Sequence, residues 1–182
     1  MIEVYSRSDL GEIIWRRIEE QGPKCDLNDI DVSHITDMSY LFENSEFDGD
    51  ISKWDMSNVE NMEYMFYNSA FNGDISNWDV SRVKNMDFMF GYSQFDGDIS
   101  GWDVSKVEKM NFMFTHSPFN GDLSKWDVSS VRDMFYMFSD SKFDGDISEW
   151  DVSSVKDMGF MFSNSPLNSR RPDWYDPKRT EL

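Results

Sequence analysis

Aspartate is the residue whose repetition in this sequence could support chemistry. One aspartate follows a glycine in every 24-residue interval, and a second follows a tryptophan five positions later. Carboxylates in a row could bind a cationic partner or calcium, although calcium takes six or more oxygens around one ion. The first set, here the Gly-Asp row, is a candidate binding row and comprises Asp50, Asp74, Asp98, Asp122 and Asp146. The second set, the Trp-Asp row, comprises Asp55, Asp79, Asp103, Asp127 and Asp151.

Both rows also have a purely structural interpretation. If the 24-residue units stack like parallel strands, equivalent carboxylates lie about 4.8 Å apart, where two bare charges repel by about 1 kcal/mol in water. Each row must then be solvated, neutralised or hydrogen-bonded. Asx turns or helix caps that accept backbone N–H groups would satisfy the carboxylates without any ligand.

A row of aromatic residues is the second candidate site. On an ideal α-helix these rings point away from the apolar stripe and form an exposed ridge that could contact a partner. If the backbone is instead a tighter turn, the rings pack between units. The candidate binding residues are Tyr64, Phe88, Phe112, Tyr136 and Phe160, with Tyr40 as the first member of the row.

We find no pattern of residues typical of catalysis. His34 and His116 are isolated, Cys25 is the single cysteine, and no nucleotide-binding or metal-ligand motif occurs. The sequence therefore predicts no enzyme activity, no cofactor and no metal site.

Composition narrows the class of partner. The 35 acidic and 17 basic residues give a net charge of −18, which repels nucleic acids and anionic membranes. No apolar run is long enough to insert into a bilayer. We expect a protein partner, no nucleic acid and a monomeric chain.

The spacing of these residues is set by an internal repeat of 24 residues without insertions. Five copies span 47–166, and a degenerate first copy spans 23–46. Residues 1–22 are a predicted N-terminal cap that contains an amphipathic helix over 8–21, and 167–182 a half-unit cap and tail in which Trp174 takes the tryptophan position. The chain is thus one solenoid domain.

The pattern within one unit predicts strand, turn and helix. Asp50, Ile51 and Ser52 alternate outward and inward like a short strand, whereas Val59, Met62, Met65 and Phe66 share one helical face. Ser57 with Glu60 matches a capping box for a helix that begins near Asn58. We therefore predict an α/β solenoid with short parallel strands on one face and short helices on the other.

The repeated string W-D-V-S-x-V-x-x-M-x-x-M-F, preceded by F-[DN]-G-D-I-S, resembles the BspA-like leucine-rich-repeat surface proteins. Repeats of this kind are abundant in mycoplasma lipoproteins. The resemblance covers residues 23–168 and implies a right-handed leucine-rich-repeat-type solenoid on the cell surface or secreted. Because this sequence shows no signal peptide, a cytoplasmic location is the alternative.

The resemblance implies an adhesin-like protein-interaction module. One alternative is a structural spacer that serves as a stiff rod and presents no site. Another is an intracellular acidic decoy that occupies a basic partner protein.

Overall fold

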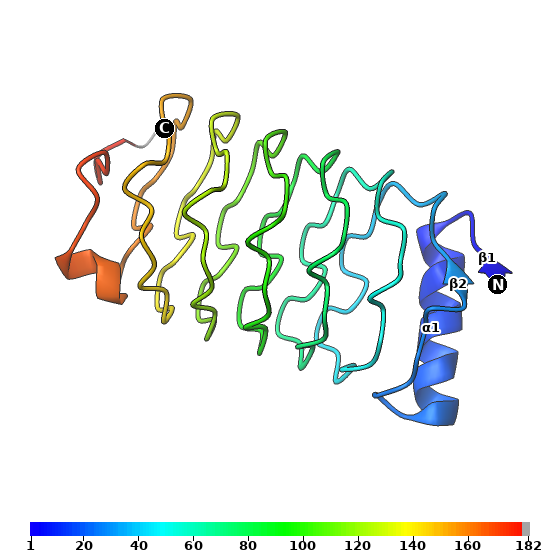
Figure 1. Cartoon of the computed structure of the whole chain (residues 1–182). Helices are drawn as coiled ribbons and strands as arrows, with labels where there is room; N and C mark the ends of the chain where they lie inside the picture. The colour runs from blue at the N-terminus through cyan, green and yellow to red at the C-terminus, as the bar shows by residue number, and fades with distance from the viewer. Residues whose placement is uncertain (180–182) are drawn as a thin grey trace.

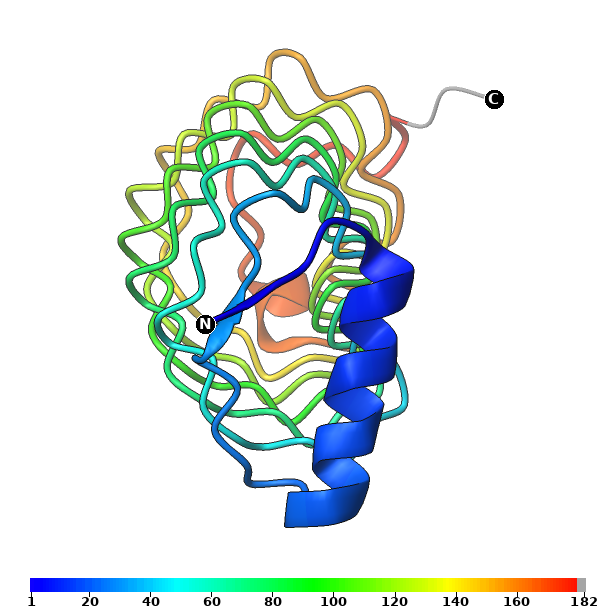
Figure 2. The same ribbon diagram turned by 90° about the vertical axis from the view of Figure 1, so that its right-hand side faces the viewer.

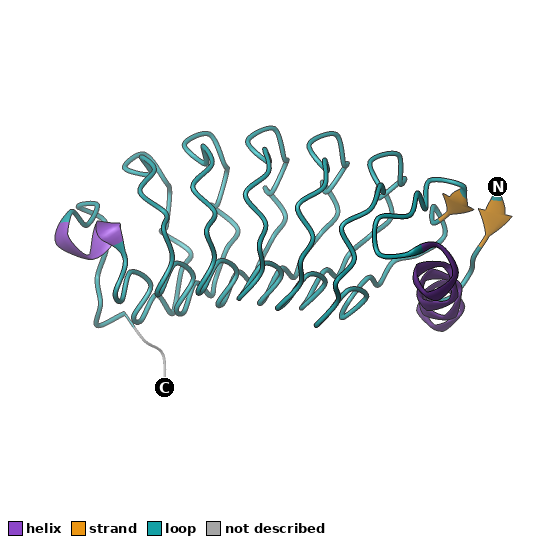
Figure 3. Ribbon diagram, turned by 90° about the horizontal axis from the view of Figure 1, so that it is seen from below, coloured by secondary structure: helices purple, strands orange, loops and turns teal. Residues whose placement is uncertain are grey.

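The computed structural model describes residues 1–179, which form a row of stacked coils between two caps (Figure 1). The regular elements are β1 (Ile2–Glu3), α1 (Arg7–Gln21), β2 (Ile30–Asp31) and the 3₁₀ helix η1 (Pro166–Ser169). Between residues 32 and 165 the described chain contains turns and irregular segments joined by isolated parallel bridges (Figure 3). The fold is therefore solenoid-like and mostly irregular. The last three residues of the predicted tail lie outside the described residues.

The N-terminal cap confirms the predicted amphipathic helix. Helix α1 buries Leu10 and Ile14 completely against the core, and it lies against the first coil (Figure 2). The N-cap is Ser6, whose hydroxyl accepts the Asp9 N–H at 3.1 Å, so the helix begins one residue before the predicted range 8–21. The helix ends at Gln21, and its C-cap is Gly22, where φ is +87°. Strand β1 pairs in parallel with β2, which the sequence did not predict.

The predicted helices of the repeated units are absent from the described coils. Ser57 and Glu60 form no capping box, because the Glu60 N–H donates to the Thr36 carbonyl of the preceding coil at 2.8 Å. The predicted strand at 50–52 is also wrong. The Ser52 N–H donates to the Asp50 carboxylate at 2.9 Å, so only the Asp50 position retains a bridge.

Overlapping β-turns replace the helix, as the coil 71–94 illustrates. The N–H groups of Met89, Gly91 and Ser93 each donate to the carbonyl three residues earlier, at 3.1 to 3.3 Å. Phe88 and Tyr92 are the third residues of two of these turns and have φ values of +58° and +56°. A left-handed residue at this position is characteristic of a type II turn and cannot continue a right-handed helix.

The coils are joined by backbone hydrogen bonds on one side of these turns. Met86 and Phe88 donate to Lys109 and Asn111 of the next coil, at 3.0 and 2.8 Å. The same pattern recurs from coil to coil at intervals of two residues. Alternate backbone N–H groups that a helix would use internally therefore donate to the next coil instead.

The core consists of rows of identical side chains. Each indole of the tryptophan row, from Trp54 to Trp174, donates to a carbonyl of the preceding coil, as Trp102 does to Ile75 at 3.1 Å. The glycine of each unit leaves room for the phenylalanine two residues before it. A Cβ at Gly73 would lie 2.8 Å from the Phe71 ring and 3.1 Å from the Gly49 carbonyl oxygen.

The C-terminal cap confirms the position predicted for Trp174. Its indole donates to the Ile147 carbonyl at 2.9 Å, and its ring stacks on Trp150 with centroids 6.3 Å apart. No helix within residues 1–179 is both long and apolar enough to cross a membrane.

Candidate functional site

The Gly-Asp row is made of Asx turns on the surface of the stack. Each carboxylate accepts the N–H of the serine two residues later, at 2.9 to 3.0 Å. The serine N–H groups lower the pKa of Asp50, Asp74, Asp98, Asp122 and Asp146 below the ordinary value. The carboxylates therefore stay ionised although neighbouring charges oppose this, as Asp50 and Asp98 do at Asp74.

The Trp-Asp row uses the same device. Its carboxylates accept serine N–H groups at 3.0 Å, as in Asp55 with Ser57. Within residues 1–179, no group of three His, Cys, Asp or Glu side chains is arranged to hold one metal ion. The carboxylates of both rows therefore stabilise local turns, and within residues 1–179 their geometry does not form a set of metal ligands.

The aromatic row forms one continuous stack, here called the aromatic ladder. Successive ring centroids lie 4.4 to 5.1 Å apart. The inner rings are half-buried, whereas Tyr40 and Phe160 at the two ends are 43% and 57% exposed. The ladder comprises Tyr40, Tyr64, Phe88, Phe112, Tyr136 and Phe160. The ladder thus combines the exposed ridge and the packing between units that the sequence left as alternatives, since the rings stack between coils and still reach the surface.

Every ring of the ladder is carried by a residue with left-handed backbone, with φ between +54° and +61°. For a residue with a Cβ this conformation costs roughly 1 to 2 kcal/mol, and glycine or asparagine would adopt it more easily. The residues four positions later in each unit also have left-handed backbone, and three of them are asparagine, which adopts this conformation at a lower energetic cost: Asn44, Asn68 and Asn164. The ladder therefore retains aromatic rings at a backbone position that favours other residues.

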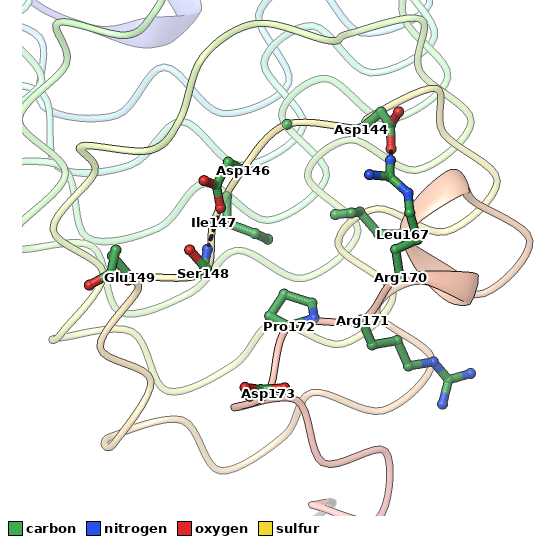
Figure 4. A pocket seen from close by; sticks show the side chains of 11 residues that line it. Asp144, Asp146, Ile147, Ser148, Glu149, Leu167, Arg170, Arg171, Pro172 and Asp173 are labelled. Atoms are coloured by element: carbon green, nitrogen blue, oxygen red, sulfur yellow. Dashed lines mark hydrogen bonds and ion pairs between the residues drawn. The ribbon is translucent and has the colours of Figure 1, made fainter.

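A polar pocket lies at the C-terminal end of the stack, between the last full coil and the C-terminal cap (Figure 4). Arg170 forms an ion pair with Asp144 on its wall, and the Arg171 side chain points away toward Tyr175, 5.4 Å from the ring centroid. Asp146 of the Gly-Asp row lines this pocket, but its carboxylate already accepts the Ser148 N–H at 3.0 Å. The pocket marks the place where the seventh unit departs from the repeat.

Comparison with known families gives a match to the family described as Mycoplasma protein of unknown function, DUF285. The match covers residues 16–118 and, in a second overlapping segment, 91–178. The chain belongs to this family. Two overlapping segments are what an internal repeat produces, because one family pattern can be placed on the stack in more than one register. No curated protein and no solved structure matches the chain.

Two features of this DUF285 protein were missed at the sequence level. Burial raises the pKa of Asp87 to about 6, although its carboxylate accepts the Asn111 N–H at 2.7 Å. A groove lined by lysine, arginine and serine side chains crosses several coils. A comparison of the five copies position by position would have shown that basic residues are frequent at the twelfth and fourteenth positions of the unit.

Proposed function

We propose that the chain is a non-catalytic protein-interaction module whose contact surface is the aromatic ladder. The observation that carries this proposal is the stack of six rings, partly exposed and held in a left-handed backbone. Strained backbone in a well-packed structure concentrates at functional positions. A broad row of aromatic surface is a common feature of protein contact sites.

Neighbouring rings widen this surface. Tyr67 lies edge-on to Tyr64, with centroids 5.1 Å apart, and Phe135 lies edge-on to Tyr136 at 4.5 Å. Tyr92 is 44% exposed and contacts Tyr67. A flat apolar partner surface could cover several of these rings at once without rearrangement of the coils.

The finer features of the proposal follow from the resemblance to BspA-like proteins. They are a right-handed leucine-rich-repeat-type winding, a cell-surface or secreted location, and a host or other extracellular protein as the partner. Membership of the DUF285 family is compatible with each of these features and supplies none of them.

The test is a pull-down from host extracellular-matrix extract with the parent and with a Phe88→Asn, Phe112→Asn variant. Asparagine tolerates the left-handed backbone, so the coils should keep their turns. The matched control is His116→Asn, Asp140→Asn, which changes left-handed residues of two neighbouring coils outside the ladder and its flanking rings. We expect a captured partner to be lost by the ladder variant and retained by the control. Equal capture by all three proteins would show that the ladder is not the contact surface.

A further inference from the structure

A second pocket lies between α1 and the first coil, at the N-terminal end of the aromatic ladder. Helix α1 runs across this end of the stack (Figure 2). The pocket is open and has a volume of about 440 Å³. Helix α1 contributes Arg7, Gly11, Glu12 and Trp15 to its lining, and the first coil contributes Tyr40 and Leu41. The pocket therefore exists only where the cap meets the repeats.

Two exposed aromatic rings line this pocket. Trp15 is 44% exposed, and Tyr40 is 43% exposed. The other six tryptophans donate their indole N–H groups to backbone carbonyls, whereas the Trp15 indole makes no such hydrogen bond within residues 1–179. Trp15 thus lies outside the hydrogen-bonded tryptophan row, and part of its ring is accessible to a ligand.

Gly11 keeps the space beside Trp15 open. It lies one helical turn before Trp15 on the same face of α1. Glycine weakens the interior of a helix relative to alanine. The backbone does not require glycine here, because φ of Gly11 is not positive, and packing does not require it, because a Cβ would have no atom within 4 Å. A larger side chain at this position would occupy the pocket.

The charges of the elements around the pocket sum to a negative value. Between residues 7 and 19, α1 carries three acidic and three basic side chains, so this part of the helix has no net charge. The segments 37–44 and 61–68 carry the first two rings of the ladder and contain no basic residue. Their three carboxylates belong to Asp37, Glu43 and Glu63.

The tyrosine at the edge of the pocket responds to these charges. Burial raises the pKa of Tyr40, the charges of Glu63 and Glu43 raise it further, and Arg7 opposes them with a weaker effect. The Arg7 guanidinium is also engaged, because it donates to the Ser39 carbonyl and hydroxyl. The electrostatic potential at the ring is therefore negative, which favours a cationic ligand over an anionic one.

We infer that this pocket holds a lysine or arginine side chain of the partner protein, with the cation over the faces of Trp15 and Tyr40. Aromatic rings attract a cation within about 6 Å of the ring centroid, and tryptophan attracts it most strongly. The Glu12 carboxylate balances the charge, and the methylene stem of the ligand side chain packs on Leu41. This inference rests on the proposed function, because Tyr40 is the first ring of the aromatic ladder.

The test is titration of the full chain with a capped pentapeptide that carries one arginine between serine and glycine residues. The NMR signal of the Trp15 indole N–H, assigned with Trp15→Phe, reports binding. The same peptide with citrulline retains nearly the shape of arginine without its charge. We expect the arginine peptide to bind about fivefold more tightly than the citrulline peptide, and added salt should weaken its binding because exposed charges are screened.

The pocket variant is Gly11→Leu, which places a side chain in the pocket. Its matched control is Gly101→Leu, the same change at another glycine whose Cβ would have no atom within 4 Å. We expect at least about tenfold weaker binding by the pocket variant and less than about twofold change in the control. Thermal unfolding checks folding, and Gly11→Leu should not melt below the parent because leucine favours a helix more than glycine. If it fails to fold, Trp15→Leu should still weaken binding, with Tyr5→Leu as its control.

Three results would overturn the inference. They are an unshifted Trp15 signal with the arginine peptide at low salt, equal binding of the citrulline peptide, and equal loss of binding in Gly11→Leu and Gly101→Leu. Tighter binding of a norleucine peptide than of the arginine peptide would assign the pocket to an apolar side chain instead.

Failure of this inference is distinguishable from failure of the proposed function. The Phe88→Asn, Phe112→Asn variant changes later coils, so it should bind the arginine peptide like the parent. If that variant loses the captured partner while the parent does not bind the peptide, the pocket inference alone fails. If that variant retains the partner, the ladder is not the contact surface, whatever the peptide does.

Discussion

At the scale of the residue, Asp87 shows how a carboxylate can take a buried position of the repeat at which the next coil has an amide. The equivalent residue of the next coil, Asn111, uses its side-chain oxygen in the same way, accepting the Phe135 N–H at 2.9 Å. Asp87 makes this hydrogen bond with a carboxylate that burial disfavours in its ionised form. Its pKa of about 6 means that ionisation is harder in the folded than in the unfolded chain.

The sign of the pH dependence follows. Between the ordinary value of 3.8 and about 6, the folded state holds more protons at Asp87, so this group makes stability fall as pH rises through that window. We predict that Asp87→Asn raises the free energy of unfolding by about 1 to 3 kcal/mol at a pH near 8 and leaves it unchanged near pH 3, below both pKa values. Denaturant unfolding at the two pH values measures this. The reverse change, Asn111→Asp, should destabilise the chain only at the higher pH, and a pH-independent effect of Asp87→Asn would contradict the assignment.

At the scale of the element, the unit is a coil whose large side chains form a wall shared with its neighbours. Trp102 is buried, contacts Phe90 with ring centroids 6.3 Å apart, and donates to the Ile75 carbonyl. Its loss would leave a cavity and remove one of the two hydrogen bonds that the Ile75 carbonyl accepts, the other coming from the Trp78 N–H at 3.2 Å. A coil is therefore stabilised by contacts with the coils on either side of it.

We predict that Trp102→Ala costs about 3 to 5 kcal/mol of stability. The matched control is Trp15→Ala on α1, where the ring is 44% exposed, with an expected cost below about 1 kcal/mol. Thermal or denaturant unfolding compares the two variants with the parent. A Trp102 variant that melts like the parent would show that the tryptophan row is not the wall of the core.

At the scale of the whole molecule, the described contacts of each repeat are with adjacent coils. The backbone donors, the tryptophan hydrogen bonds and the ring stacks all connect one unit with the next. In such a one-dimensional stack, stability is close to a sum of unit and neighbour terms. The two caps, α1 and the segment around Trp174, close the ends of the core.

We predict that deletion of one whole unit, residues 95–118, gives a shorter folded chain, because every core row and backbone donor regains an equivalent neighbour. It should melt below the parent, since one interface is lost. Deletion of residues 95–106 is the control and should not fold, because half a unit puts the rows out of register. Circular dichroism and thermal unfolding distinguish the cases, and equal behaviour of both deletions would contradict a modular stack.

The sequence by itself determined the period, the caps and which side chains are buried, because a strict repeat places equivalent residues in equivalent surroundings. Val59, Met62, Met65 and Phe66 are all fully buried, as their spacing indicated. Only the tertiary structure decided that this stripe is not helical. Spacing reports which side chains face inward, but the backbone conformation depends on where the N–H groups find acceptors, and here many of them find acceptors on the neighbouring coil. The same holds for the candidate sites. The aspartate and aromatic rows were visible in the sequence, whereas the serine N–H partners, the ladder of stacked rings and the groove across several coils arise only when the coils are stacked.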